Sequence, residues 1–304
     1  MKKQTEKGNG QSVRFSSAEL CASLLPVRPD DGNKGTFGRA LLFCGSEQYR
    51  GAACLSSEAA LAGGAGLVEL ASCEAVVSLV LSRAPSVIGT AYVPSAIGAY
   101  LPLGLTKKAT AILIGCGSGR SLRLCLSLYE LLTIPGCPVV LDADALNSLA
   151  LKRETSLERL KDAARPVILT PHPLEFSRIS GLAPDAIAAD RVGVAVAFAK
   201  EYGVTLVLKG SGTVIASPDG EVTVNTTGGS GLAKGGSGDV LAGLLVSLLA
   251  QGTDPYGAAV LAVYLHGAAG DALTKEFSPY GVRPDDLPRE IARQTACLCA
   301  RVCQ

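Results

Sequence analysis

The chain has no tryptophan, only two histidines and few charged residues. Aromatic residues make up 5% and charged residues 18% of its 304 residues, and the formal net charge is +1. His172 and His266 lie too far apart in the sequence for their spacing to predict an imidazole-rich metal cluster. Lysine and arginine are scattered singly, which argues against a general nucleic-acid-binding surface. We therefore expect small molecules as partners.

Signals for a membrane or for secretion are also missing. Residues 1–11 are polar and contain no apolar core of a signal peptide, so we expect a disordered extension and a cytoplasmic protein. The uncharged run from Val87 to Thr106 is interrupted by Pro94 and Pro102, and we do not expect it to span a membrane. No Pro/Ser-rich or charged linker divides the remainder. Residues 12–304 are therefore expected to form one domain.

The ten cysteines do not predict disulfide bonds. Five lie in apolar segments, where a small hydrophobic residue suffices, and reduced thiols are expected there: Cys44, Cys54, Cys73, Cys116 and Cys125. Three more occur in the expected C-terminal helix, at Cys297, Cys299 and Cys303. Offsets of two and six do not bring these three to one helix face, which argues against a structural zinc site.

Glycine and short apolar segments are abundant instead. Six short apolar segments predict buried strands, at residues 40–44, 67–71, 111–115, 138–142, 167–170 and 205–210. Longer helical patterns lie between them, at residues 52–62, 121–132, 145–151 and 185–202. This alternation predicts a three-layer α/β/α fold with a mainly parallel sheet. Residues 213–225 alternate around Asp219-Gly220, which predicts an antiparallel hairpin near one edge.

The most informative segment runs from Gly231 to Gly252, GLAKGGSGDVLAGLLVSLLAQG. Its glycines predict a loop that leads into the start of a buried helix. Amides at a helix start have no helical partner and attract anions. Asp239 lies among these donors, which suits a base that takes the proton of a hydroxyl about to meet a phosphoryl group. A simple helix cap is the structural alternative.

Polar side chains follow four of the expected strands. They are carried by GCGSG (115–119), DADALN (142–147), TPHPLE (170–175) and KGSGT (209–213). The carboxyl ends of parallel strands share one edge of the sheet, where ligands gather in open α/β folds. We therefore expect these four segments to converge on one site.

These motifs, in this order, resemble the ADP/ATP-dependent NAD(P)H-hydrate dehydratases, which have a ribokinase-like fold. The resemblance begins near KGTFG (34–38) and runs through CGSEQYRGAACLSSEAAL, GCGSG, LDADALN, ILTPHPLE, VLKGSGTVI and AKGGSGDVLAG to AVYLHG. It implies that ADP or ATP phosphorylates the C6 hydroxyl of the S-epimer of hydrated NADH or NADPH, after which loss of phosphate restores the ring. It also implies Mg²⁺, a homotetramer and a separate epimerase acting upstream.

The resemblance assigns roles to residues of this chain. It implies that Asp239 is the base and that the amides of Gly235, Gly236, Ser237 and Gly238 hold the transferring phosphoryl group. Lys209, Gly210, Ser211, Gly212 and Thr213, with Gly238, would line the ADP/ATP site. Ala52, Gly117 and His172, with Asp239, would face the hydrated dinucleotide.

Other interpretations of single residues remain open. His172, between two prolines, is either a structural residue or one that recognises ribose or phosphate. Asp142 and Asp144 are candidates for water-mediated contact with Mg²⁺, although capping of the helix at Ala145 is the preferred interpretation of Asp144. Lys209 suits phosphate as a point charge or is a solvated strand-end residue. His266 is expected to be a packed or hydrogen-bonded residue outside the site.

The sequence departs from the family pattern at two positions. Leu174 stands where a glycine is expected and would narrow the approach of substrate to that turn. Gly229 stands where relatives often carry an asparagine, so that contact is not carried over. No epimerase domain of roughly two hundred residues fits beside a single domain of this size.

Two rival functions fit the glycine-rich helix start. A small-molecule kinase of the same superfamily, of the hydroxymethylpyrimidine or hydroxyethylthiazole type, would release a stable phosphate ester. A non-catalytic nucleotide sensor would keep the fold without turnover. The sequence alone fixes neither the ADP or ATP preference nor the NADHX or NADPHX preference, and it names no metal ligand.

Overall fold

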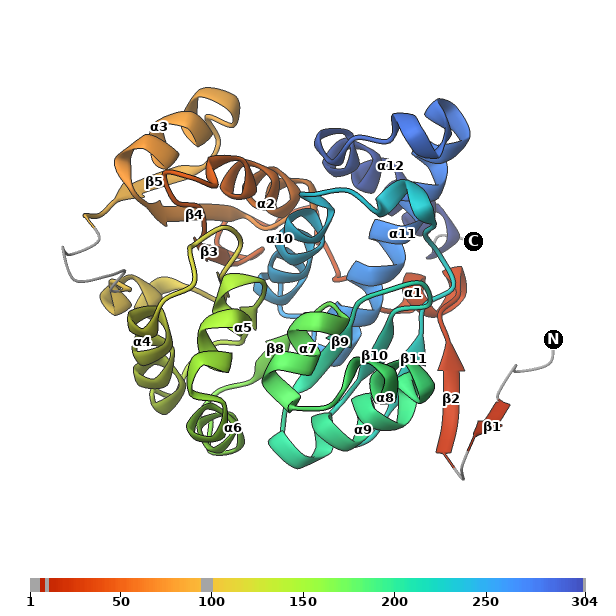
Figure 1. Ribbon diagram of the computed structural model, residues 1–304. Coiled ribbons are helices and arrows are strands. Elements are labelled where there is room, and N and C mark those ends of the chain that lie inside the picture. The colour runs from red at the N-terminus through yellow and green to blue at the C-terminus, as the bar shows by residue number, and fades with distance from the viewer. Residues whose placement is uncertain (1–5, 9–10, 94–100, 303–304) are drawn as a thin grey trace.

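The computed structural model describes residues 6–8, 11–93 and 101–302 of the chain (Figure 1). Its strands form one 11-stranded sheet in the order β1-β2-β11-β10-β9-β8-β7-β6-β3-β4-β5. The run from β9 to β5 is parallel throughout, whereas β10 is antiparallel to both β9 and β11. The predicted three-layer fold with its mainly parallel sheet and antiparallel hairpin is therefore confirmed.

The strands are short, as expected for buried parallel strands. Their bounds are β1 Glu6–Gly8, β2 Gln11–Phe15, β3 Arg39–Phe43, β4 Leu67–Ser72, β5 Ile88–Ala91, β6 Ala111–Ile114, β7 Val139–Leu141, β8 Val167–Leu169, β9 Thr205–Leu208, β10 Val214–Ala216 and β11 Val222–Val224.

Helices cover both faces of the sheet. One layer contains α1 Ala18–Ser23, α2 Arg50–Ala62, α3 Glu74–Arg83, α10 Ser237–Ala250, α11 Pro255–Gly281 and α12 Leu287–Val302. The other contains α4 Leu122–Thr133, α5 Asp144–Leu149, α6 Arg153–Lys161, α7 Pro173–Ser180, α8 Pro184–Ala189 and α9 Arg191–Tyr202. Alternate strand residues divide between the two cores: Leu42 and Leu113 face the first layer, whereas Leu41 and Ile112 face the second.

Two sequence predictions differ from the structure. The helix expected over residues 185–202 is two helices, because Asp190 leaves helical geometry and its side chain caps α9 by accepting from the Gly193 amide at 2.8 Å. Within the expected extension 1–11, Glu6–Gly8 pairs with β2 as β1, and β2 itself begins at Gln11. The other residues of that segment lie outside the described residues, as do Cys303 and Pro94.

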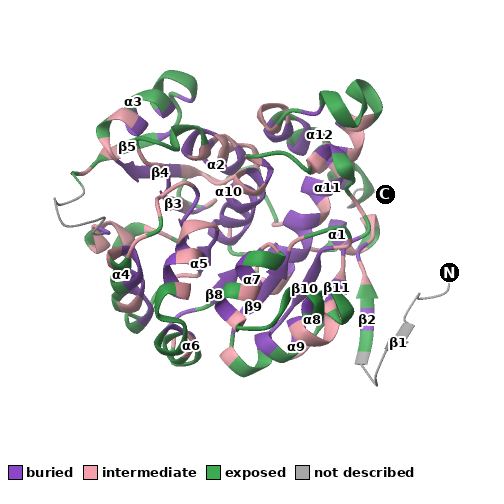
Figure 2. Ribbon diagram, viewed as in Figure 1, coloured by how far each residue is buried: buried purple, intermediate pink, exposed green. Residues whose placement is uncertain are grey.

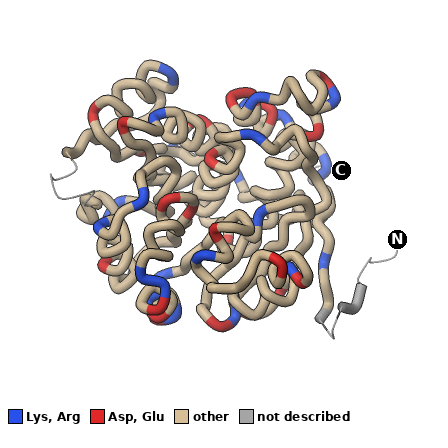
Figure 3. Tube along the Cα trace, viewed as in Figure 1, with Lys and Arg blue, Asp and Glu red and all other residues tan. Residues whose placement is uncertain are grey.

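Other expectations agree with the described residues. The cysteines among them are free thiols. No helix of the described chain has both the length and the apolar character needed to cross a membrane. Basic and acidic residues are interspersed along the trace, as Figure 3 shows.

Helix α10 is the centre of the first layer. Every residue from Val240 to Ala250 is buried, and Figure 2 shows this helix in the buried colour. Gly243 lets α10 lie against the backbone of α2, since a Cβ at this position would come within 2.1 Å of the Ser56 carbonyl oxygen. The approach of the two helices thus fixes α10, whose N-terminus carries Asp239.

We expect Gly243→Ala to lower the free energy of unfolding by about 1–3 kcal/mol, because the added methyl group forces the two backbones apart. This loss outweighs the gain of about 1 kcal/mol that alanine brings to a helix interior. Gly51→Ala in α2 is the matched control, since a Cβ there meets no atom within 4 Å, and it should leave stability unchanged or higher. Urea unfolding measures both variants. Equal stability of Gly243→Ala and wild type would contradict the close contact.

Candidate active site

The predicted strand-end segments do converge at one edge of the sheet. β9, β8, β7 and β6 are consecutive neighbours, so the segments that follow them emerge side by side. There the Lys209 Nζ donates to Asp142 Oδ1 at 2.7 Å and lies 4.0 Å from Glu175 Oε2. Thr170 donates its hydroxyl to the same Asp142 oxygen at 2.8 Å. Three strands are thus joined by one buried polar cluster.

Burial and neighbouring charges shift the pKa of Lys209 in opposite directions. Burial lowers its pKa, but the negative charges of Asp142 and Glu175 and the hydrogen bond to Asp142 raise it further, so the net shift is upward. Lys209 is therefore an ammonium ion held in place, and the alternative of a solvated strand-end lysine is wrong.

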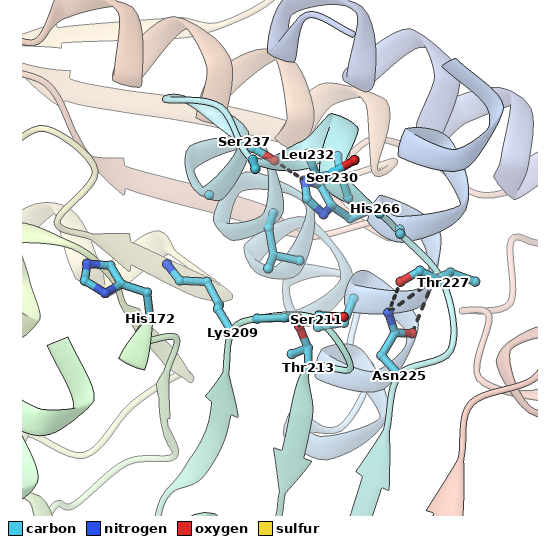
Figure 4. A pocket seen from close by; sticks show the side chains of 18 of the residues that line it. His172, Lys209, Ser211, Thr213, Asn225, Thr227, Ser230, Leu232, Ser237 and His266 are labelled. Carbon is cyan, nitrogen blue, oxygen red and sulfur yellow. Dashed lines mark hydrogen bonds between the residues drawn. The ribbon is translucent and has the colours of Figure 1, made fainter. Parts of the chain in front are cut away.

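A cavity of about 750 Å³ opens beside this cluster (Figure 4). Seven predicted site residues line it: His172, Lys209, Gly210, Ser211, Thr213, Ser237 and Gly238. Leu232, Leu241 and Val263 give it an apolar wall, and residues of the 225–234 segment complete it. A cavity of this size, with an apolar wall and a few polar groups, suits a nucleotide-sized ligand.

Arg191, which was not predicted from the sequence, holds the loop 209–213 in place. Its guanidinium donates to the carbonyls of Ser211 at 2.6 Å, Leu208 at 3.0 Å and Lys209 at 3.2 Å. Arg191 follows the helix break at Asp190, so the break places its side chain at the loop. No sequence motif indicates this contact.

The N-terminus of α10 adjoins the cavity. Gly236 is its N-cap in left-handed conformation (φ 99°), and no side chain caps the helix. The Ser237 amide donates to the Lys234 carbonyl at 3.2 Å, so it is already engaged. The amides of Gly235, Gly236 and Gly238 remain the candidates for an anion, in a place that the helix dipole favours.

Asp239 lies in the first turn of α10. Burial raises the pKa of its carboxyl to about 6, and the nearby charge of Asp142 adds to the increase. The nearby Cys116 thiol and the charge of Lys209 oppose this shift. A carboxyl tuned in this way is suited to accept a proton near neutral pH.

Ala52 and Gly117 lie together, because a Cβ on Gly117 would come within 2.8 Å of the Ala52 Cβ. They do not line the 750 Å³ cavity, and neither do Gly212, Gly235, Gly236 and Asp239. The loop of Gly117 still reaches the site, because the Sγ of the preceding Cys116 lies within 4.8 Å of a ligand atom of Asp239. The predicted residues thus fall into two groups, one that lines the cavity and one beside Gly117, and Asp239 lies close to the residue that precedes Gly117.

His172 has a structural function in the described fold. Its Nδ1 accepts from the amides of Leu174 at 3.1 Å and Glu175 at 3.4 Å, and the Glu175 carboxylate accepts from the His172 amide at 2.9 Å. This capping box begins α7. The side chain also borders the cavity and is partly exposed. Burial and the charge of Lys209 lower its pKa, so the imidazole is neutral at physiological pH.

Asp144 does not cap the helix, and the preferred interpretation of this residue is wrong. It lies inside α5, whose N-cap is Ala143, and the Asp144 Oδ2 accepts from the Gly119 amide at 2.8 Å. Its carboxylate therefore fixes the GCGSG loop. The sequence pattern favoured a cap because an aspartate before an apolar helical segment usually is one.

His266 lines the cavity, although the sequence placed it outside the site. Its Nε2 lies 3.2 Å from the Ser237 hydroxyl, and this pair is drawn as a dashed line in Figure 4. Burial lowers the pKa of His266 to about 4, so the ring is neutral. The expectation of a hydrogen-bonded histidine is confirmed, and its partner belongs to the predicted anion loop.

The two positions that depart from the family pattern differ in where they lie, since one is exposed to solvent and the other lines the cavity. Leu174 is 54% exposed, so its side chain points largely into solvent. Gly229 lines the cavity, as does Asn225, whose amide group donates to the Thr227 carbonyl at 2.8 Å. The described chain therefore does carry an asparagine at this wall, four residues before Gly229.

We expect Asp239→Asn to stabilise the protein at pH 8. The folded carboxyl has a pKa of about 6, against 3.8 for an aspartate free in solution, so its contribution to stability becomes more favourable as the pH falls through 6. At pH 8 the charged form costs about 1–3 kcal/mol, which the neutral amide removes, and the difference should vanish near pH 4. Chemical unfolding at both pH values measures this. Asp219→Asn, in the exposed hairpin turn, should show neither effect, and an Asp239→Asn gain that is equal at pH 4 and pH 8 would contradict the argument.

Comparison with known proteins agrees with this geometry. The family model described as NAD(P)H-hydrate dehydratase matches residues 40–293. The ADP-dependent (S)-NAD(P)H-hydrate dehydratase of Neisseria meningitidis is 37% identical over 297 residues, which is 97% of this chain and 96% of the relative. A bifunctional NAD(P)H-hydrate repair enzyme of Moorella thermoacetica is 38% identical, and the chain spans only 52% of its length.

A solved structure is also similar. The ADP/ATP-dependent NAD(P)H-hydrate dehydratase of Bacillus subtilis, co-crystallised with ATP and Mg²⁺, has a TM-score of 0.82 at 34% identity. The match covers 93% of this chain and 98% of that one. The chain therefore belongs to the NAD(P)H-hydrate dehydratase family.

Proposed function

We propose that this protein uses ADP or ATP to dehydrate the S-epimer of hydrated NADH or NADPH and so restores the reduced dinucleotide. The observation that carries the proposal is the position of Asp239. Its carboxyl has a raised pKa and lies in the first turn of an uncapped helix. Asp239 follows Gly238, which lines the nucleotide-sized cavity, and its carboxyl lies within 4.8 Å of the Sγ of Cys116, the residue before Gly117. A base between two ligand sites suits transfer of a phosphoryl group from one ligand to the other.

The chemistry balances with few protein groups. Asp239 takes the proton of the C6 hydroxyl, and the hydroxyl oxygen attacks the terminal phosphorus of the nucleotide. The P–O bond to the rest of the nucleotide breaks, and the leaving group is ADP when ATP is used or AMP when ADP is used. Amides of Gly235, Gly236 and Gly238 stabilise the charge on that group. The ring nitrogen then expels phosphate from C6, and loss of a C5 proton completes the dihydropyridine.

The nucleotide is proposed to occupy the 750 Å³ cavity. Lys209 and the loop 209–213 would face its phosphates, and Leu232, Leu241 and Val263 would pack against the base. Magnesium supplies positive charge to the phosphate oxygens during transfer. Asp144 fits its hydration shell best, since one oxygen holds the Gly119 amide and the other remains. Asp142 fits less well, because Lys209 and Thr170 already share its Oδ1 and its Oδ2 faces the Cys116 thiol, whereas Mg²⁺ prefers oxygen ligands.

Three further assignments complete the proposal, and two of them, the assembly and the epimerase, rest on the resemblance. We propose that the protein is a cytoplasmic homotetramer and that an epimerase acts before it. Light scattering coupled to size-exclusion chromatography measures the assembly directly.

The deciding assay mixes hydrated NADH with ADP or ATP and Mg²⁺ and follows phosphate release together with absorbance of the reduced nicotinamide. A dehydratase gives both signals in equal amounts. A small-molecule kinase gives a stable phosphate ester and no recovered absorbance, and a sensor gives neither signal.

Asp239→Asn should reduce turnover by about 10²–10⁴-fold, as expected for loss of a general base. Nucleotide affinity, measured by calorimetry, should change little because the cavity lining is intact. Asp219→Asn is the control and should retain full turnover. Full activity of Asp239→Asn would refute the role of this carboxyl.

The value of kcat/KM should also rise with pH. The base must be deprotonated, so kcat/KM should rise tenfold per pH unit below about 6 and level off above it, in line with the pKa of Asp239. Phosphate release is the suitable readout, since reduced nicotinamides decay in acid. A rate that is constant from pH 5 to pH 8 would contradict Asp239 as the base.

A further inference from the structure

A thiol and two carboxylates meet beneath the N-terminus of α10. One ligand atom from each of Cys116, Asp142 and Asp239 lies within 4.8 Å of the other two. The Cys116 thiol contacts Asp142 Oδ2 at 3.7 Å. Cys116 and Asp142 are buried, with 0% and 1% exposure, whereas Asp239 is only partly buried. Asp239 is therefore the most exposed member of the group.

The spacing matches a tetrahedral metal site after a small contraction. Zinc binds sulfur at about 2.3 Å and carboxylate oxygen at about 2.0 Å, so its sulfur and oxygen ligands lie roughly 3.5 Å apart. The distance between Cys116 and Asp142 is already close to this value. The remaining pairs lie no more than 4.8 Å apart, so they need to approach by at most about 1.5 Å, which we expect side-chain rotation to allow.

The charges around the cluster also favour a cation. Asp142 and Asp239 contribute two carboxylates, Asp144 adds a third charge that reaches Asp239, and Lys209 is the ammonium ion beside them. Lys209 lies on Asp142 Oδ1, whereas the thiol faces Oδ2. The lysine thus leaves the oxygen that faces Cys116 open to a metal ion.

We propose that Cys116, Asp142 and Asp239 form a binding site for one thiophilic divalent cation of the Zn²⁺ or Cd²⁺ type. Binding displaces the thiol proton to solvent and forms one metal–sulfur and two metal–oxygen bonds, with water as a fourth ligand. The sulfur distinguishes this site from that of Mg²⁺, which prefers oxygen ligands. The ion holds the Asp239 carboxylate, so it blocks proton transfer. This inhibition rests on the proposed function, whereas binding does not.

The test is a Cd²⁺ titration of the full chain, monitored by the ultraviolet sulfur-to-metal charge-transfer band. Cys297 and Cys299 are exposed thiols, so the parent protein carries serine at both positions and at Cys303. We expect a band that saturates at one ion per chain in the presence of excess Mg²⁺. Cys116→Ser should abolish the band, and Cys137→Ser, a half-buried cysteine outside the cluster, should leave it unchanged.

Asp239→Asn keeps the thiol and provides a second variant in case Cys116→Ser fails to fold. It should weaken Cd²⁺ binding by about 10-fold or more, since it removes one ligand. No band in the parent, a band that survives Cys116→Ser, or equal affinity in Asp239→Asn would each overturn the proposed site.

An activity measurement separates this site from the proposed function. Zn²⁺ should inhibit the parent in proportion to occupancy, and each variant is compared with its own metal-free rate. Relief of inhibition in Cys116→Ser supports both the site and the role of Asp239. Stoichiometric binding without any inhibition supports the metal site and refutes Asp239 as the base.

Discussion

The burial of negative charge at the carboxyl edge of the sheet is the constraint on which the site depends. Asp142 ends β7 and is almost fully buried, and its charge is balanced by Lys209 from the end of β9. A buried charge is tolerated only when it is paired and hydrogen-bonded. Lys209 and Thr170 meet this requirement, so the three neighbouring strands must keep their register. Asp239 then enters the same region from α10, where burial and the nearby charge of Asp142 raise its pKa.

The same edge explains why stability and reactivity oppose each other in this protein. A carboxyl that stays ionised without cost would have a low pKa and would be a weak base. Burial beside Asp142 makes the charged form of Asp239 expensive and therefore able to accept a proton. Burial of residues 240–250 of α10 and the close contact of this helix with α2 at Gly243 contribute favourable free energy that offsets this cost. Packing in the helix layer thus sustains an unfavourable charge at its end.

The sequence predicted those parts of the fold that local pattern determines. Short apolar segments between glycine-rich turns gave the central strands, and the Asp219-Gly220 turn gave the β10–β11 hairpin. The break at Asp190 was not predicted, because an apolar pattern continues through it and a side-chain cap decides the matter. In the site, Lys209 and the loop after it were found from strand ends. Arg191 and His266 were missed, since their contacts join segments that are distant in the sequence and carry no motif.

The chemical surroundings of Cys116 were also not predictable from the local sequence. Its apolar neighbours favoured a small hydrophobic residue, and burial agrees with that interpretation. The local pattern does not show which polar groups lie beside the buried thiol. These are Asp142, which follows the next strand, and Asp239, from a helix more than a hundred residues later. A thiol among aliphatic side chains is inert, whereas a thiol between two carboxylates donates a hydrogen bond and can exchange its proton for a metal ion. The chemistry of this edge therefore follows from the order of the strands more than from any single motif.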